Sequence, residues 1–196
     1  MKIIGIIGGC GSGKSEVSKL IQNHSNAYVI NADKIGHDII KKDTKAYKSI
    51  LKVFGNDILD DNGNIDRKSL GKLVFSNNEK LKQLTSITHP IINEKIAILI
   101  DEIIKENYYD YIILEITALG SGKMYQLIDE FWYVYCDLEV RLVRLSRSRN
   151  MSKETAMSII EKQLTDNEFR KAADVIIDNS YKKDNTYKQI IKYLKG

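Results

Sequence analysis

A stretch near the beginning of the chain is rich in glycine and ends in a lysine and a serine. Gly8, Gly13, Lys14 and Ser15 meet the pattern G-x-x-x-x-G-K-[ST] in full. Glycines let backbone N–H groups wrap around phosphate oxygens, the lysine reaches the β- and γ-phosphates, and the hydroxyl suits Mg²⁺. The pattern therefore predicts a site for ATP and Mg²⁺, with Ser15 as the metal ligand. The predicted nucleotide ligands are Gly9, Cys10, Gly11, Ser12, Gly13, Lys14, Ser15 and Glu16.

The flanking segments distinguish a phosphate loop from a flexible turn that happens to carry Lys-Ser. Lys2–Ile7 (KIIGII) is short, apolar and bounded by glycine, which is typical of a buried strand. Lys14–Gln22 carries its apolar residues on one face, which predicts a helix. A helix N-terminus adds positive potential at the loop. A strand before and a helix after the motif therefore favour the phosphate loop.

Further apolar segments predict the rest of a sheet. Tyr111–Ile116 (YIILEI) is apolar on both faces, as expected of a central parallel strand. The other predicted strands are Tyr28–Ile30, Trp132–Cys136 and Val175–Ile177, and helical patterns separate them. Strands that alternate with helices predict a parallel sheet covered on both sides. The expected fold class is α/β, a P-loop nucleotide-kinase-like three-layer α/β/α core with a five-stranded parallel sheet.

The long interval between the second and third strands predicts an inserted lobe. A plain crossover needs about a dozen residues, whereas this interval is several times longer and mostly helical in pattern. We expect residues 34–105 to form a helical lobe and residues 1–33 and 106–196 to form the core. Pro90 within the lobe is expected to mark a helix start or a kink.

Composition excludes little beyond a membrane protein and a disulfide-rich one. The net charge of +4 suits a polyanionic small substrate as well as nucleic acid. No nucleic-acid-binding module is recognised, and no apolar run approaches the roughly 20 residues that span a bilayer. The two cysteines have no metal-ligand spacing. Asp60-x-Asn62-x-Asn64 is better read as a polar turn than as a calcium loop, because Gly71 stands where a final glutamate is needed. We expect a cytoplasmic protein that acts without a nucleic-acid or membrane partner.

Polar side chains at the other predicted strand ends could complete the site, because ligands bind beyond the carboxyl ends of parallel strands. Asp33 could accept a hydroxyl proton, or it could cap a helix over Lys34–Ile40. Glu115 could support Mg²⁺, or it could have only a local hydrogen-bond partner. Arginines after the fourth strand could form a lid over the transferring phosphoryl group or a solvated basic face. These arginines are Arg141, Arg144, Arg147 and Arg149.

Over most of its length the chain resembles the dephospho-coenzyme A kinase family. The opening loop resembles the family's GGIGSGKS, and Asn31-Ala32-Asp33 resembles its Asp-Ala-Asp. Further motifs match in order and spacing: Phe54-Gly55, Asp61-x-Gly63-x-Ile65-x-Arg67, Thr88-His89-Pro90-Ile91-Ile92, Gln163 and Ala173-Asp174-Val175-Ile176-Ile177-Asp178-Asn179. The resemblance implies that ATP phosphorylates the ribose 3′-hydroxyl of dephospho-coenzyme A, the last step of coenzyme A synthesis.

The resemblance also implies roles for individual residues. Asp33 would be the base, and the loop after Asp178-Asn179 would flank the adenine, with Asn179 as a nucleotide ligand. The helical lobe would hold the acceptor, with Asp33, His89 and Glu115 as ligands. A lid would cover about residues 138–152. The family's usual lid arginine falls on Ser148 here, so the catalytic candidates beside Lys14 and Asp33 are Arg144, Arg147 and Arg149.

One segment departs from the family pattern. Where the family has Asp-x-Pro-Leu-Leu-x-Glu, Glu115–Ser121 keeps the acid in kind but lacks the proline, one leucine and the final glutamate. Two alternatives therefore stay open: a divergent P-loop kinase for another nucleotide-like or small hydroxyl acceptor, and a non-catalytic ATP-binding regulatory module. Lys14, Ser15 and Asp33 favour a catalyst. A monomer is favoured.

Overall fold

The chain folds into two compact units. The computed structural model describes all residues except Ser76, Ala118, Ser121, Lys195 and Gly196, and it leaves the side chains of Phe75 and Arg149 undescribed. The first unit contains Met1–Asn31 and Ile100–Gly196, and the second contains Ala32–Leu99.

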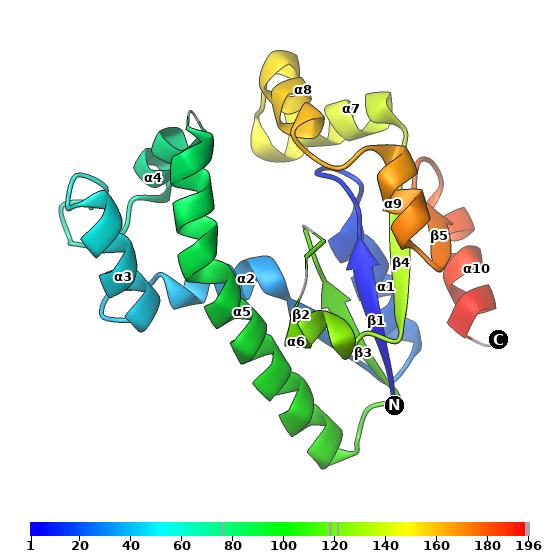
Figure 1. Ribbon diagram of the computed structural model, residues 1–196. Helices are drawn as coiled ribbons and strands as arrows, with labels where there is room; N and C mark the ends of the chain where they lie inside the picture. The colour runs from blue at the N-terminus through cyan, green and yellow to red at the C-terminus, as the bar shows by residue number, and fades with distance from the viewer. Residues whose placement is uncertain (76, 118, 121, 195–196) are drawn as a thin grey trace. The chain divides into compact units, whose positions relative to one another are not determined.

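The first unit is built on a five-stranded sheet in which every strand pairs in parallel with its neighbours. The order is β2-β3-β1-β4-β5, which can be followed in Figure 1. The strands are β1 (Lys2–Ile7), β2 (Ala27–Asn31), β3 (Tyr111–Glu115), β4 (Glu130–Tyr135) and β5 (Val175–Asp178). The predicted parallel sheet is confirmed, although Ile116 and Cys136 lie just beyond the ends of β3 and β4. All five carboxyl ends lie at one edge of the sheet.

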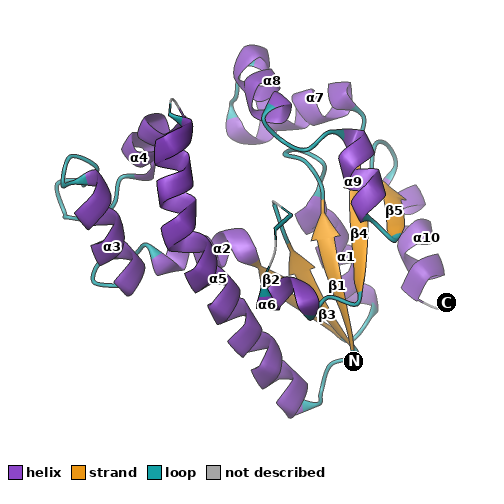
Figure 2. Cartoon of the chain, viewed as in Figure 1, coloured by secondary structure: helices purple, strands orange, loops and turns teal. Residues whose placement is uncertain are grey.

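Helices cover both faces of the sheet, so the predicted three-layer core is also confirmed (Figure 2). On one face, α1 (Lys14–His24) and α10 (Lys183–Leu194) contribute to the core. On the other face, α9 (Asp166–Ala172) places the ring of Phe169 on that of Tyr133, with centroids 5.0 Å apart. Further helices of this unit are α6 (Lys123–Gln126), α7 (Leu138–Arg149) and α8 (Lys153–Glu161).

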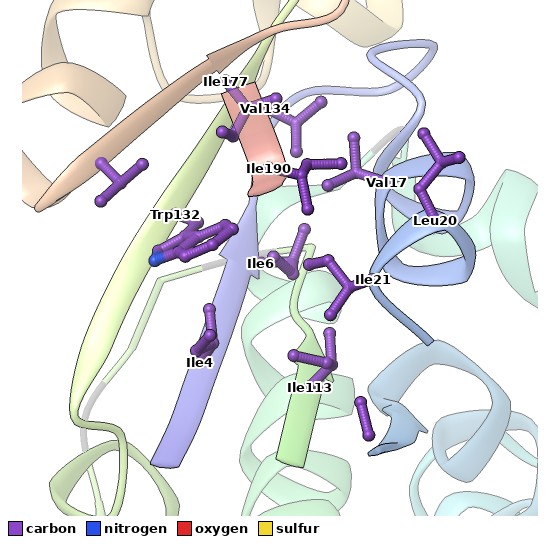
Figure 3. Close-up of a cluster of buried hydrophobic side chains, with 12 residues drawn as sticks. Ile4, Ile6, Val17, Leu20, Ile21, Ile113, Trp132, Val134, Ile177 and Ile190 are labelled. Carbon is purple, nitrogen blue, oxygen red and sulfur yellow. The ribbon is translucent and has the colours of Figure 1, made fainter. Parts of the chain in front are cut away.

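The main core lies between the sheet and the layer of α1 and α10 (Figure 3). Alternate residues of each strand point to this face, and they meet apolar residues of the two helices. The cluster includes Ile4, Ile6, Ile113, Trp132, Val134 and Ile177 from the sheet and Val17, Leu20, Ile21 and Ile190 from the helices. Burial of a large apolar side chain contributes about 1.5–3 kcal/mol. This core holds β1 and α1 in place, and with them both ends of the loop that joins them.

The second unit is helical and has its own core. It contains α2 (Ala32–Ile39), α3 (Lys45–Phe54), α4 (Arg67–Phe75) and the part of α5 (Asn78–Glu106) that precedes Ile100. Its main cluster of buried residues is Tyr47, Ile50, Ile58, Ile65, Leu70 and Val74. Pro90 lies inside α5, so the expectation that it marks a helix start is wrong. A proline removes one backbone hydrogen bond, and the packed helix continues through it.

The turn at Asp60 is held by its own hydrogen bonds. The carboxylate accepts from the backbone N–H groups of Asn62 (3.0 Å) and Asn64 (2.8 Å). The bond from Asn64 is the main cause that lowers the pKa of Asp60. This is the polar turn expected from the sequence. Within the described residues, no cluster of three or more His, Cys, Asp or Glu side chains could hold a metal.

None of the described helices combines the length and the apolar character that a membrane crossing requires.

Candidate functional site

The predicted phosphate loop joins the end of β1 at Ile7 to the start of α1 at Lys14. The backbone has positive φ at Gly11 (80°) and Gly13 (91°), a conformation that L side chains rarely adopt. Lys14 Nζ lies within the loop and donates to Gly8 O (2.7 Å). Gly13 precedes the helix and provides no side-chain cap. The first-turn N–H groups of α1 therefore form an anion site of the kind that binds phosphate.

Protein groups packed against the loop leave little room for side chains at its glycines. A Cβ atom on Gly9 would lie 2.3 Å from Arg141 Nη2, and one on Gly13 would lie 2.2 Å from Asn179 Nδ2. On Gly11 it would lie 3.0 Å from Arg141 O. Helix α7 and the segment after β5 therefore press against the loop, which adds a second reason for glycine to the phosphate contacts inferred from the motif.

A serine hydroxyl and a carboxylate meet beside the loop. Ser15 Oγ donates to Glu115 Oε2 (2.7 Å), and Asn31 Nδ2 donates to the same oxygen (2.9 Å). Glu115 is only 7% exposed, and its register partner on β2 is Asn31. Glu115 thus has the local hydrogen-bond partners that were considered for it, and one of them, Ser15, is the predicted metal ligand.

This pair fits Mg²⁺. Mg²⁺ is a hard cation that takes oxygen ligands and is usually held by one or two protein groups together with phosphate and water. The hydroxyl of Ser15 and the carboxylate of Glu115 supply two such oxygens within hydrogen-bond distance of each other. Asn31 can orient the carboxylate without adding a negative charge.

Asn179 holds the phosphate loop through its side chain. Its Nδ2 donates to Ser12 O (2.9 Å), and its Oδ1 accepts from Thr186 Oγ1 (3.0 Å). The residue is 2% exposed. The predicted nucleotide ligand therefore fixes the loop backbone through its amide, a role that the sequence did not indicate. Thr186 was not identified from the sequence.

Some arginines of α7 contact the phosphate loop. Arg141 Nε donates to Cys10 O (2.8 Å). Arg144 donates to Ser12 O (3.3 Å) and Asn179 O (2.9 Å). Arg147 is exposed on the same helix, and the side chain of Arg149 lies outside the described residues. Two of the four arginines thus brace the loop through its carbonyl groups.

The α7–α8 segment packs against the loop through apolar contacts as well. Leu142, Leu145 and Ala156 form a small buried cluster. Cys10 of the loop packs on this cluster together with Met151, Met157 and Ile160. Asn150, between the helices, has left-handed backbone geometry (φ 48°, ψ 41°), which ends α7. The side chain of Cys10 therefore faces the helices of the predicted lid segment.

A charged network lies where β4 leads into α7. Asp137 accepts hydrogen bonds from the hydroxyl groups of Tyr135 (2.6 Å) and Tyr181. These bonds lower the pKa of Asp137, and the same carboxylate raises the pKa of Tyr135 to about 12. Burial raises the pKa of the neighbouring Cys136 thiol. At neutral pH the network thus has one negative charge at the start of α7, where the helix dipole favours it.

Two of the remaining predicted residues, Asp33 and His89, belong to the second unit, and Glu16 belongs to the first. Asp33 lies in the first turn of α2, which begins at Ala32. The alternative that Asp33 is the N-cap of a helix over Lys34–Ile40 is therefore wrong, because the helix starts two residues earlier. His89 lies within α5. Glu16 lies in the first turn of α1.

A parallel sheet with a glycine-rich loop between its central strand and the next helix, and a hydroxyl–carboxylate pair beside that loop, is the arrangement of a P-loop nucleotide-binding protein. The family model described as dephospho-CoA kinase matches residues 2–185. The chain belongs to the dephospho-CoA kinase family, as its motifs indicated, and it is an ATP-dependent phosphotransferase.

Individual relatives cover nearly the whole chain. A dephospho-CoA kinase of Carboxydothermus hydrogenoformans is 42% identical over 194 residues, which cover 99% of this chain and 93% of the relative. A solved Thermus thermophilus structure is similar with a TM-score of 0.82 at 25% identity, covering 99% of this chain and 96% of that one. The structure of a dephospho-CoA kinase from Campylobacter jejuni gives a TM-score of 0.70 at 28% identity, covering 100% and 96%.

Proposed function

We propose that the chain transfers the γ-phosphoryl group of ATP to the ribose 3′-hydroxyl of dephospho-coenzyme A. Membership of the family supports this reaction, and the single structural observation that carries it is the contact of Ser15 with Glu115 beside the phosphate loop. Such a site supplies positioning and charge stabilisation, which is most of what phosphoryl transfer requires.

The phosphates of ATP would lie against the loop. Lys14 would move its ammonium group from Gly8 O, its present acceptor, to the β- and γ-phosphate oxygens. Ser15 and Glu115 would hold Mg²⁺, whose chemistry is to neutralise charge on the phosphate oxygens. The adenine would lie beside the loop after β5, near a hollow of about 200 Å³ lined by Asp178, Tyr181, Lys182, Asn185 and Gln189.

Asp33 would accept the proton of the attacking hydroxyl. It lies two residues after Asn31, which is bonded to Glu115. We assign residues 34–105 to an acceptor lobe with His89 among its ligands, and residues 1–33 and 106–196 to the catalytic core. We also propose that the protein is cytoplasmic and that it is a monomer. Analytical ultracentrifugation would measure the oligomeric state.

An ADP-release assay tests the function directly. The wild-type protein with ATP and Mg²⁺ should release ADP fastest with dephospho-coenzyme A, measured as kcat/KM over a panel of nucleotide-like and small hydroxyl acceptors. Preference for another acceptor would favour the divergent kinase, for which the altered Glu115–Ser121 segment is the motivation. ATP binding without turnover on any acceptor would favour the regulatory module.

Residues of about 138–152 are proposed as a lid, and single alanine variants test it. An arginine that acts on transition-state charge is worth about 10³-fold or more in turnover. We expect a loss of this scale in at least one of Arg144→Ala, Arg147→Ala and Arg149→Ala. Arg144→Ala should also lower the free energy of unfolding by roughly 1–3 kcal/mol, because Asn179 O loses its side-chain donor and Ser12 O loses one of its two.

Turnover and thermal unfolding of the three variants are measured beside Lys153→Ala, which removes an exposed positive charge from the first residue of α8, next to the lid segment. Turnover near the wild-type value in all three arginine variants would exclude the lid.

A further inference from the structure

The backbone of Cys10, in the middle of the phosphate loop, is held on both of its polar groups. Its N–H donates to Gln163 Oε1 (2.8 Å), and its carbonyl accepts from Arg141 Nε (2.8 Å). Arg141 Nη2 also donates to Gln163 Oε1 (3.2 Å). The three residues therefore form a closed ring of hydrogen bonds, in which a single amide oxygen of Gln163 accepts from two donors.

Gln163 is itself held in place by the helices on either side of it. It lies in the short connection between α8, which ends at Glu161, and α9, and its N–H donates to Ile160 O (3.1 Å). On the other side, Thr165 and Glu168 form a capping box at the start of α9. Helix α9 is packed on the sheet through Phe169. The amide oxygen of Gln163 thus has a defined position relative to β1 and the loop.

The position of Cys10 matters for phosphate binding because the next residue, Gly11, adopts positive φ. A loop with several glycines samples many conformations, and fixing the backbone of each residue in one conformation costs roughly 1–2 kcal/mol. Groups that fix the loop before the ligand arrives reduce the cost of binding. The N–H of Cys10 points to Gln163, so it is not among the groups that can face phosphate. Its bond selects the backbone conformation in which the following N–H groups can do so.

We propose that Gln163 is a positioning residue that presets the phosphate loop for ATP through the backbone N–H of Cys10. The inference rests on the proposed binding of ATP at this loop. It assigns Gln163 a role in nucleotide affinity, although the residue follows Gly13 by 150 positions in the sequence and belongs to the α8–α9 connection.

Gln163→Leu removes the acceptor with little change in side-chain length, so the N–H of Cys10 and Nη2 of Arg141 both lose the oxygen that they share. We expect the Kd for ATP to rise about tenfold, the scale of losing one or two partly buried hydrogen bonds that hold the loop, while the KM for the acceptor at saturating ATP stays unchanged. Gln163→Glu keeps an acceptor oxygen at the same place and should remain within about threefold of the wild-type Kd. Calorimetry with ATP and Mg²⁺, without acceptor, measures these values independently of the acceptor's identity.

Thr165→Ala is the matched control. It breaks the capping box of the same connection and lowers the melting temperature, but it leaves the Cys10 contact in place, so the Kd for ATP should stay at the wild-type value. Equal ATP affinity in Gln163→Leu and the wild type, with only a lower melting temperature, would overturn the proposal. If the leucine variant does not fold, Gln163→Asn withdraws the oxygen by one methylene, and an unchanged Kd in that variant overturns it equally.

The same titrations separate this inference from the proposed function. Wild-type protein that binds no ATP would refute both. Wild-type protein that binds ATP while the Gln163 variants bind it equally well would refute the role of Gln163 alone.

Discussion

Lys14→Ala is expected to abolish most activity while the protein stays folded. The ammonium group is the only side-chain charge that the motif itself places on the β- and γ-phosphates. Loss of one preorganised group of this kind costs roughly 10²–10³-fold in turnover, and the affinity for ATP should fall as well. The fold should persist, because the contact of Lys14 Nζ with Gly8 O is partly exposed and α1 is held by its buried face. Calorimetry gives the ATP affinity, and ADP release gives the turnover.

Lys19→Ala is the control for this variant, because Lys19 is an exposed lysine of the same helix. It removes an equal charge from α1 at a position outside the loop and should bind ATP as the wild type does. Unchanged ATP affinity in Lys14→Ala would contradict the assignment of the loop.

Asp33→Asn should separate a base from a residue that merely starts a helix. Asp33 lies in the first turn of α2, where a carboxylate gains about 0.3–1 kcal/mol from the helix dipole. Asparagine loses that small stabilisation and cannot accept a proton. A positioned acid–base group is worth roughly 10²–10⁴-fold, but the loose transition state of phosphoryl transfer reduces the demand on a base. A fall of turnover of about 30-fold or more therefore supports the role.

Turnover with dephospho-coenzyme A, ATP affinity and the melting temperature are measured together. Only turnover should change strongly. Asp38→Asn, on the same helix, removes the carboxylate that pairs with Lys41 (2.7 Å) and should keep full turnover. Full activity of Asp33→Asn would show that Asp33 has no part in proton transfer.

The sheet could be predicted because each strand has a short apolar sequence of its own. Lys2–Ile7 was predicted with its bounds, since glycines follow it directly. The start of α2 could not be predicted from local residue types. Asn31 and Asp33 both favour the position before a helix, and the choice is made by tertiary structure, because Asn31 is the last residue of β2 and bonds to Glu115.

The motif could identify the residues that face the phosphates but not the residues of other elements that hold the loop backbone. Lys14 and Ser15 follow from local spacing. Cys10 is separated from Arg141 by 131 residues and from Gln163 by 153, so no local pattern relates them. Glycine likewise indicated closeness to phosphate, whereas the structure adds closeness to α7 and to Asn179.

The crowding around Gly9 couples positions 9 and 141 in the evolution of the chain. A side chain at position 9 would occupy the place of the Arg141 guanidinium, and Arg141 could then no longer hold the backbone of Cys10. A lineage that replaced Gly9 would have to move the Arg141 guanidinium aside or shorten residue 141, and in either case it would need another partner for the loop. Positions 9 and 141 are therefore expected to co-vary among descendants of a common ancestor, and a defect at one should find its suppressor mutations at the other.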